Sequence, residues 1–256
     1  MSSRLVNPVE ISFFIIATRN YKGYARSLIL SLDRHMRSRF QVHVLTDDVK
    51  DFNTIVMERN LGTVRATQIE SFGWPDATLR RFELMMRIFS AVNGRIVCYL
   101  DADTLLLRDT SIEDFQECLS DSRQVAAVRH PGYYKRSLIL RIANSTFLGP
   151  WETRRQSAAF VPFQKRRSYV CGGVIFGLAA SFREMCEDIR RCILSDFEKG
   201  IIAKHNDESY LNAWSLRTQT NKVSPEWAYA EGYRNLKGMN PRIQVLHKPN
   251  WWTRER

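Results

Sequence analysis

The sequence predicts an α/β fold, and three observations near the N-terminus support this prediction. An apolar run at residues 11–17 is typical of a strand, residues 21–36 carry apolar side chains at helical spacing, and residues 40–45 again are typical of a strand. A strand, a helix and a strand in this order favour a βαβ unit with parallel strands. The 256 residues suit one large α/β domain or two small ones, and no linker divides them.

The rest of the chain continues this alternation. The sequence predicts strands at 63–69, 96–100, 124–129 and 168–178, and helices from Pro75 to about 92, over 179–198 up to Gly200, and again after Asn206. Gly172 and Gly173 interrupt the strand at 168–178, which indicates close approach of a ligand or of backbone. Residues 135–168 are polar, basic and poorly periodic, and they predict a long segment without regular structure, which is usually functional or mobile.

Asp101 and Asp103 directly follow the predicted strand at 96–100. Such a strand places its terminal side chains at the carboxyl edge of the sheet, where open α/β folds bind ligands. Carboxylate oxygens suit Mg²⁺ or Mn²⁺, and these ions in turn suit a diphosphate. The pair therefore indicates a site for a metal and a nucleotide sugar. The alternative is a strand end with two solvated aspartates, as in an ordinary turn.

A second acidic pair, Asp207 and Glu208, lies at the start of the helix predicted after Asn206. The simpler interpretation is that Asn206 or Asp207 caps this helix, because acidic side chains are favoured in a first helical turn. Arg80 and Arg81 also allow two interpretations. Either both arginines are solvated beside a core-facing stripe, or one of them reaches a phosphate or a sugar.

The composition is that of an ordinary globular protein, with 44% hydrophobic residues and a net charge of +11. This charge favours anionic partners such as nucleotide phosphates, nucleic acid or an acidic surface. Nucleic acid is the less favoured partner, because the sequence has no clear basic helix or aromatic-interleaved basic patch. No apolar run is long enough to span a bilayer, and the N-terminus lacks the apolar core of a signal peptide. The five cysteines have no zinc-type spacing and predict reduced thiols.

Several motifs together resemble glycosyltransferase family 6, which contains the blood-group A and B transferases and the α-1,3-galactosyltransferases. They follow the family's order from about residue 10 onward, at 16–21 (IATRNY), 79–83 (LRRFE), 99–103 (YLDAD), 129–134 (RHPGYY), 155–162 (RQSAAFVP), 169–177 (YVCGGVIFG), 207–212 (DESYLN), 222–226 (KVSPE) and Lys248. The resemblance implies one GT-A catalytic domain over residues 1–256, with a mixed central sheet flanked by helices. A Rossmann-like half at about 10–134 would bind nucleotide and metal, and about 135–256 would form the acceptor and catalytic half with a C-terminal tail.

The resemblance also implies roles for particular residues. Asp101 and Asp103 would hold Mn²⁺, or Mg²⁺, across the diphosphate of a UDP-sugar, and Asp207 and Glu208 would be the catalytic acidic pair. The implied nucleotide-binding residues are Ile16, Ala17, Thr18, Tyr21, Ala102, Lys248 and Arg254, those at the donor sugar are Arg81, Cys171, Gly172 and Gly173, and those at the acceptor are His130, Gly132 and His205. The implied reaction moves GalNAc or Gal from UDP onto a galactoside-type glycan in α-1,3 linkage, with retention of configuration.

Retention leaves two chemical routes open. By analogy with retaining hydrolases Glu208 is the nucleophile, whereas in a front-face route it stabilises the cation and orients the acceptor. Donor choice follows from size, because Gly132, Cys171 and Gly173 match the family's donor-selecting positions and are small. They leave room for an N-acetyl group, so UDP-GalNAc is expected ahead of UDP-Gal.

Two departures from the family pattern concern the acceptor. The acidic pair is usually preceded by Trp-His, whereas His205 and Asn206 occupy those positions here. Ala230, with Glu231 after it, stands where a further acidic residue is expected. These departures leave open whether the acceptor is the usual fucosylated galactoside.

Animal members of the family have an N-terminal membrane anchor and a stem, and neither is expected here, because the first predicted strand begins at residue 11. The chain resembles the short bacterial or phage-borne form, so a cytoplasmic location in a bacterial or phage-infected cell is expected. Three competing interpretations remain. The first is another GT-A glycosyltransferase, such as a family 8-like enzyme, for which His247 is the only late candidate metal ligand. The others are a basic nucleic-acid-binding protein and a sugar-binding module without catalysis.

Overall fold

A computed structural model describes residues 8–73, 75–120, 124–134, 137–218 and 220–247. Its helices and strands, in chain order, are β1 (Ile11–Ala17), α1 (Lys22–His35), β2 (Phe40–Thr46), α2 (Val49–Asn53), β3 (Gly62–Gln68), α3 (Asp76–Leu79), α4 (Arg81–Ile88), β4 (Ile96–Leu100), β5 (Thr104–Leu106), α5 (Ile112–Gln116), β6 (Val125–Arg129), α6 (Leu138–Ser145), β7 (Val170–Leu178), α7 (Ala179–Glu198), α8 (Asn206–Arg217), β8 (Asn221–Val223), β9 (Tyr229–Ala230) and β10 (Ile243–Val245).

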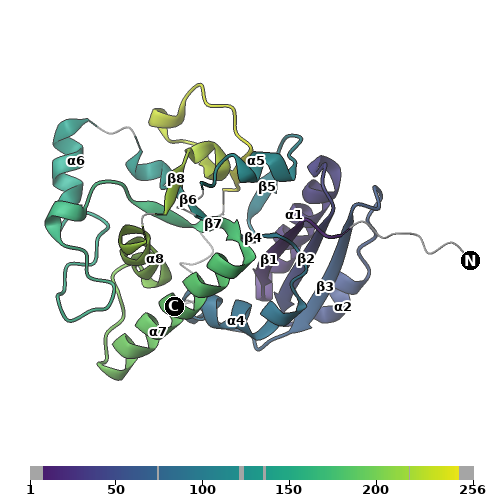
Figure 1. Ribbon diagram of the computed structural model, residues 1–256, viewed down its shortest axis with the longest axis horizontal. Helices are drawn as coiled ribbons and strands as arrows, with labels where there is room; N and C mark the ends of the chain where they lie inside the picture. The colour runs from purple at the N-terminus through teal and green to yellow at the C-terminus, as the bar shows by residue number, and fades with distance from the viewer. Residues whose placement is uncertain (1–7, 74, 121–123, 135–136, 219, 248–256) are drawn as a thin grey trace, which may run out of the picture.

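A seven-stranded mixed sheet runs through the centre of the molecule in the order β3-β2-β1-β4-β7-β6-β8 (Figure 1). Strands β3, β2, β1 and β4 are parallel, β7 is antiparallel to both β4 and β6, and β6 is parallel to β8. The α/β class, the βαβ start and the mixed sheet flanked by helices are thereby confirmed. A second, three-stranded sheet of β5, β10 and β9 lies beside it.

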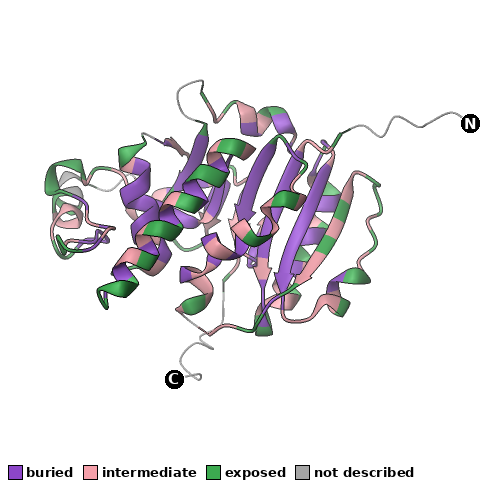
Figure 2. Cartoon of the chain, turned by 60° about the horizontal axis from the view of Figure 1, so that its bottom comes forward, coloured by how far each residue is buried: buried purple, intermediate pink, exposed green. Residues whose placement is uncertain are grey.

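Each face of the central sheet carries its own hydrophobic core, and β1 contributes to both. Phe13 and Ile15 pack with α1 and α5 on one face, while Phe14 packs with α4 and α7 on the other. Successive side chains of a strand point to opposite faces, so a strand covered on both sides needs an unbroken apolar run. Figure 2 shows the resulting purple, buried centre of the sheet under helices with green outer faces.

Two predicted segments differ from the structure. The helix expected from Pro75 to about 92 is divided into α3, which ends at Leu79, α4, and a short 3-10 turn, before which the backbone of Ile88 (φ −110°, ψ 6°) is no longer helical. The segment 135–168 was expected to lack regular structure, but it contains α6, whose first turn is capped by Ser137. Leu138, Ile139 and Leu140 are consecutive, so the sequence has no helical spacing there.

The predictions for the end of α7 and for the cysteines are confirmed. Gly200, in the left-handed conformation with φ +68°, follows the end of α7 as expected. All five cysteines are free. Within the described parts of the chain, none of the helices combines the length and the apolar character needed to cross a bilayer.

Candidate functional site

The ends of β1 and β4 lie at the same edge of the central sheet. The two strands are parallel, with Phe14 opposite Tyr99, so the residues after each strand leave the sheet on the same side. Asp101 follows β4, and its backbone N–H donates to the carbonyl of Gly173 at 2.8 Å. Because β7 is antiparallel to β4, the start of β7 lies beside the end of β4 at this edge. Residues far apart in sequence are thus brought together.

Arg81 lies at the centre of this junction. Its Nε is 3.0 Å from the Asp207 carboxylate, its Nη2 is 3.4 Å from Asp101, and its Nη1 donates to the Gly172 carbonyl at 2.6 Å. The side chain is only 7% exposed, so the prediction of two solvated arginines is wrong for Arg81. Arg80, by contrast, is part-exposed and its guanidinium lies 4.2 Å from the Phe72 ring centre.

The second acidic pair does not cap helix α8. His205 is the residue before its first turn and makes no side-chain cap, and Asn206 has a positive φ of 46°. Asp207 instead pairs with Arg81, and the Glu208 carboxylate accepts the backbone N–H of Gly172 at 3.0 Å. The capping interpretation is therefore wrong, because both carboxylates point toward the start of β7.

Burial shifts the pKa of each ionisable group at this junction. Burial acts to lower the pKa of Arg81, but Asp207, followed by Tyr99 and Asp101, raises it well above its ordinary value, so the guanidinium stays charged. Burial raises the pKa of Asp207 to about 6 against the opposing effect of Arg81. Burial likewise raises the pKa of Glu208 to about 7, with the Gly172 amide opposing it.

Tyr99 and Asn212 belong to the site although sequence reasoning missed them. The Tyr99 hydroxyl donates to Asp101 at 2.8 Å, and its ring centre lies 4.6 Å from the Arg81 guanidinium carbon. Asn212 holds α8 against β7 through both backbone groups of Val170, at 2.9 and 2.8 Å. Sequence signals existed for both: Tyr99 is two residues before Asp101 along an extended chain, and Asn212 is one helical turn after Glu208.

Two glycines of β7 leave space for the acidic groups. A Cβ on Gly173 would lie 2.8 Å from the Asp101 carboxylate, and a Cβ on Gly172 would lie 3.2 Å from both Arg81 and Asp207. The prediction that a close approach requires these glycines is confirmed. Cys171, the preceding residue, is buried, and burial raises the pKa of its thiol.

The predicted nucleotide-binding residues lie at the end of β1 and in the short turn after it. Ala17 and Thr18 are buried, and Ile16 and Tyr21 are partly exposed. Arg19 was not among the predicted site residues. It has a positive φ of 51°, and its backbone N–H donates to the Asp47 carboxylate at 3.0 Å, which fixes the turn. Lys248 and Arg254 lie outside the described residues.

A divalent metal would fit the two aspartates only together with its substrate. Asp101 is 35% exposed, whereas Ala102 and Asp103, in the turn before β5, are both 2% exposed. No cluster of three or more acidic, histidine or cysteine ligands occurs in the described part of the chain. Mg²⁺ and similar ions are, however, commonly held by one or two carboxylates plus substrate phosphates, so a two-aspartate set suits a metal that arrives with a diphosphate.

Several aromatic side chains gather beside Glu208. Tyr169 lies between His130 and Trp151, with ring centres 5.9 and 5.1 Å away, and the His205 ring is 6.4 Å from it. The buried Tyr169 hydroxyl faces Glu208 without reaching a standard hydrogen bond. The predicted acceptor residues His130 and His205 are therefore brought to one cluster. Gly132 is part of it, since its backbone N–H donates to His130 at 3.0 Å.

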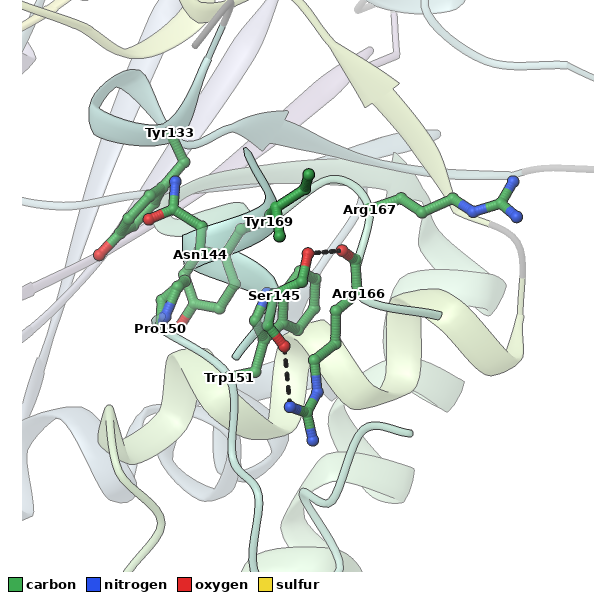
Figure 3. Close-up of a pocket in the computed structure, with 9 residues that line it drawn as sticks. Tyr133, Asn144, Ser145, Pro150, Trp151, Arg166, Arg167 and Tyr169 are labelled. Atoms are coloured by element: carbon green, nitrogen blue, oxygen red, sulfur yellow. Dashed lines mark hydrogen bonds between the residues drawn. The ribbon is translucent and has the colours of Figure 1, made fainter. Parts of the chain in front are cut away.

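A cavity of about 180 Å³ opens beside this aromatic cluster (Figure 3). Tyr133, Trp151 and Tyr169 supply its rings, and Ile142, Asn144 and Ser145 of α6 supply another wall. Arg166 closes one side by donating to the Ser145 carbonyl at 2.9 Å, while the Arg167 guanidinium points away from the other lining residues. Rings next to amide and hydroxyl groups form a surface suited to a sugar ring.

Comparison with known proteins matches these features to one family. Residues 5–250 match the family model described as glycosyltransferase family 6. The chain is 25% identical over 245 residues to the O-antigen biosynthesis glycosyltransferase WbnI of Escherichia coli, covering 94% of this chain and 97% of that protein. It is 28% identical to the human globoside alpha-1,3-N-acetylgalactosaminyltransferase 1, over 86% of this chain and 61% of that protein. It is 23% identical to the rat histo-blood group ABO system transferase 1, over 93% of this chain and 66% of that protein.

Proposed function

We infer the reaction from one premise: the chain belongs to glycosyltransferase family 6, as the match over residues 5–250 shows, and is a glycosyltransferase that uses a nucleotide-sugar donor and a glycan acceptor. We propose that it transfers GalNAc, or Gal, from UDP to a galactoside-type glycan in α-1,3 linkage, with retention and with the help of Mn²⁺ or Mg²⁺. Family membership excludes the family 8-like alternative, and no feature of the described residues favours nucleic acid as the main partner.

The observation that carries the proposal is the position of Arg81 between the two acidic pairs. Its guanidinium contacts Asp101 at 3.4 Å and Asp207 at 3.0 Å, and one residue further along α8 Glu208 is fixed by the amide of Gly172. Asp101, a candidate metal ligand, and two candidate catalytic carboxylates thereby lie around one buried cation, and this supports the proposal. A site for diphosphate departure next to a site for sugar transfer requires this arrangement.

The implied metal would be held by Asp101 and Asp103 together with the diphosphate. When bound, it would act as a Lewis acid that neutralises the charge developing on the leaving UDP. Tyr99 keeps the Asp101 carboxylate in position through its 2.8 Å hydrogen bond. Burial raises the pKa of Tyr99 well above its ordinary value, with Arg81 opposing, so the hydroxyl keeps the proton that it donates.

The transfer step breaks the bond between the sugar C1 and the diphosphate oxygen, and the bonding electrons leave with UDP. In the double-displacement route, a Glu208 carboxylate oxygen bonds to C1, and the acceptor hydroxyl then displaces it. In the front-face route the acceptor oxygen bonds to C1 directly, and Glu208 stabilises the cationic sugar. In the front-face route the acceptor proton goes to the departing diphosphate oxygen. In the double-displacement route it goes to the diphosphate oxygen of the UDP that the first step released.

The aromatic cluster supports an acceptor beside Glu208, which Tyr169 approaches. His130 and Tyr169 contact each other there, and the cavity beside them is of a size for one sugar ring. The relatives named for N-acetylgalactosaminyl transfer support GalNAc as donor.

The proposal is tested by measuring UDP release from UDP-GalNAc and from UDP-Gal, with Mn²⁺ and with EDTA. We expect release with Mn²⁺ only, faster with UDP-GalNAc, and stimulation by galactoside acceptors from a panel that includes fucosylated ones. Asp103→Asn removes one of the two carboxylates while keeping the shape of the side chain, and it should abolish release.

The matched control is Asp109→Asn, an exposed aspartate that pairs with Arg37 at the surface. It should leave UDP release unchanged. Full activity in EDTA would refute metal dependence, and rates more than tenfold faster with UDP-Gal would overturn the donor preference. No UDP release from any UDP-sugar would reject the proposed reaction.

A further inference from the structure

Helix α6 and the turn after it expose an unusually large set of apolar side chains. Ile139, Leu140 and Ile142 are 79%, 46% and 56% exposed, and Phe147 and Leu148 are both 74% exposed. We call these five residues the α6 patch. Single exposed apolar residues are common, but these five lie between positions 139 and 148, and an exposed apolar group of this kind marks an interaction site.

Basic residues are concentrated in the same segment. Between positions 135 and 168 the sequence has eight lysines and arginines against a single acidic residue, Glu152. These 34 residues therefore carry seven of the eleven net positive charges of the chain. Glu152 does not offset them at the surface, because its side chain is 2% exposed and paired with Arg154 at 2.7 Å.

Described basic side chains lie next to the α6 patch. Arg166 donates to the carbonyl of Ser145, the last residue of α6, and this contact places the exposed Lys165 and Arg167 near the end of the helix. Lys204 approaches from another element and donates to the carbonyl of Phe147 at 3.0 Å. Phe163, 55% exposed, lies in the same basic turn. The surface thus combines an apolar centre with a cationic border.

We propose that the α6 patch docks the protein on an anionic lipid bilayer, as a peripheral contact. An apolar helix face bordered by lysine and arginine is the composition that inserts into the headgroup boundary of membranes with anionic lipids. A second copy of the chain is the weaker candidate. A two-fold interface brings the same surface of both copies together, and here it would place one basic segment against another.

The position of the α6 patch gives this docking a consequence for the proposed transfer. Ile142 belongs both to the patch and to the lining of the cavity beside Tyr169. In Figure 1, α6 lies at the end of the molecule opposite β3 and the N-terminal half of the sheet. A docked protein would hold the cavity at the membrane surface, within reach of a glycan attached to lipid. This last point rests on the proposed function, whereas the docking itself does not.

The test measures flotation of the full chain with vesicles of phosphatidylglycerol and phosphatidylcholine, and with vesicles of phosphatidylcholine alone. The wild type should bind the anionic vesicles, and binding should weaken as salt is added. The triple variant Ile139→Ser, Phe147→Ser, Leu148→Ser should bind about tenfold or more weakly, since three apolar side chains are lost. The variant Lys165→Glu should also bind more weakly, because each charge near the surface contributes separately.

The matched control combines Val56→Ser with Lys50→Glu. Val56 is 77% exposed and Lys50 is exposed too, but both lie in the N-terminal half, in and after α2. This control should bind vesicles like the wild type. UDP release with a water-soluble acceptor should be the same in all variants, which shows that they are folded and separates docking from catalysis.

A failure of the docking proposal can be distinguished from a failure of the proposed function. Vesicle binding without UDP release would reject the proposed function and leave the docking surface intact. UDP release without vesicle binding would overturn the docking proposal. Light scattering that shows a dimer, dispersed by the triple variant, would likewise overturn it and assign the α6 patch to self-association.

Discussion

The Nε of Arg81 lies 3.0 Å from the Asp207 carboxylate, and the two side chains are only 7% and 6% exposed. A buried ion pair of this kind adds little net stability, because both charges lose their water, but it fixes the orientation of both groups. The same guanidinium also orients the Asp101 carboxylate, from which its Nη2 lies 3.4 Å away. Arg81 therefore links the metal-binding and catalytic halves of the proposed site.

Replacing Arg81 with alanine should lower the free energy of unfolding by about 3–5 kcal/mol, since Asp207 would stay buried without its partner. Urea denaturation measures the change. Arg80→Ala is the control, because Arg80 forms only part-exposed ion pairs and should cost less than about 1 kcal/mol. Equal losses in the two variants would contradict the central position of Arg81.

Donor hydrolysis should depend on the ionisation of Glu208. Its pKa is about 7 because the group is removed from water. The ionised carboxylate is the useful form in either chemical route, so kcat/KM should rise with pH through an acid limb near pH 7. Tyr169 lies beside this carboxyl and lowers its pKa, so Tyr169→Phe should move the limb to higher pH. A limb that stays in place in this variant would exclude Glu208 as its origin.

His43 should make the protein less stable in acid. The ring is buried in β2 beside Phe14, and burial, with Arg65 contributing, lowers its pKa from 6.5 to about 4. Above pH 6.5 the ring is neutral in both the folded and the unfolded protein, so His43 costs no stability. Between pH 6.5 and about 4 only the unfolded chain takes up the proton, so the free energy of unfolding falls over this range. The loss amounts to about 3 kcal/mol.

The variant His43→Leu should remove this dependence, and urea denaturation at several pH values measures it. Asp207 and Glu208 act in the opposite direction, because their raised pKa values favour the folded state as the pH falls. The diagnostic quantity is thus the difference between wild type and variant. If that difference does not change between pH 6.5 and 4, His43 takes up its proton as readily in the folded protein as in the unfolded chain, and the prediction is wrong.

Gly173→Ala should weaken the proposed metal site. The new Cβ would lie 2.8 Å from an Asp101 oxygen, and Asp101 is also held by Tyr99 and Arg81, so the carboxylate must shift. A misplacement of this order costs up to about 100-fold in rate, and it should be accompanied by a higher Mn²⁺ requirement for UDP release. Gly23→Ala in α1 is the control, because its Cβ would meet nothing within 4 Å and should stabilise the helix by about 1 kcal/mol. Equal Mn²⁺ requirements in both variants would contradict this role of Gly173.

The sequence predicts the sheet edge well because local patterns determine it. The apolar run at β4 is buried on both faces, and Asp101 follows it directly, so strand, edge and carboxylate are all readable from neighbouring residues. Gly173 was recognisable for the same reason, as a glycine within a strand. These features depend on residues that are close in the chain.

The remaining features depend on contacts between distant segments. Arg80 and Arg81 are adjacent and chemically alike, and only contacts with distant segments, at Gly172 and Asp207, show which of the two is buried. Asp207 has the pattern of a helix cap, and its partner is 126 residues away in sequence. Helix α6 was not predicted because Ile139, Leu140 and Ile142 are exposed, and core periodicity is the signal by which helices are found.

The antiparallel pairing of β7 with β4 has a consequence for how activity is gained during folding. Leu100 and Val174 are partners, so this pairing closes the whole segment between them into a loop, and long loops are entropically costly to close. Contacts of such high sequence separation form slowly. The parallel strands β1 to β3 can assemble earlier from nearer segments, but they hold neither Gly172 nor Asp207. In a refolding experiment, UDP release should therefore return in the slowest phase, after most of the secondary structure has formed.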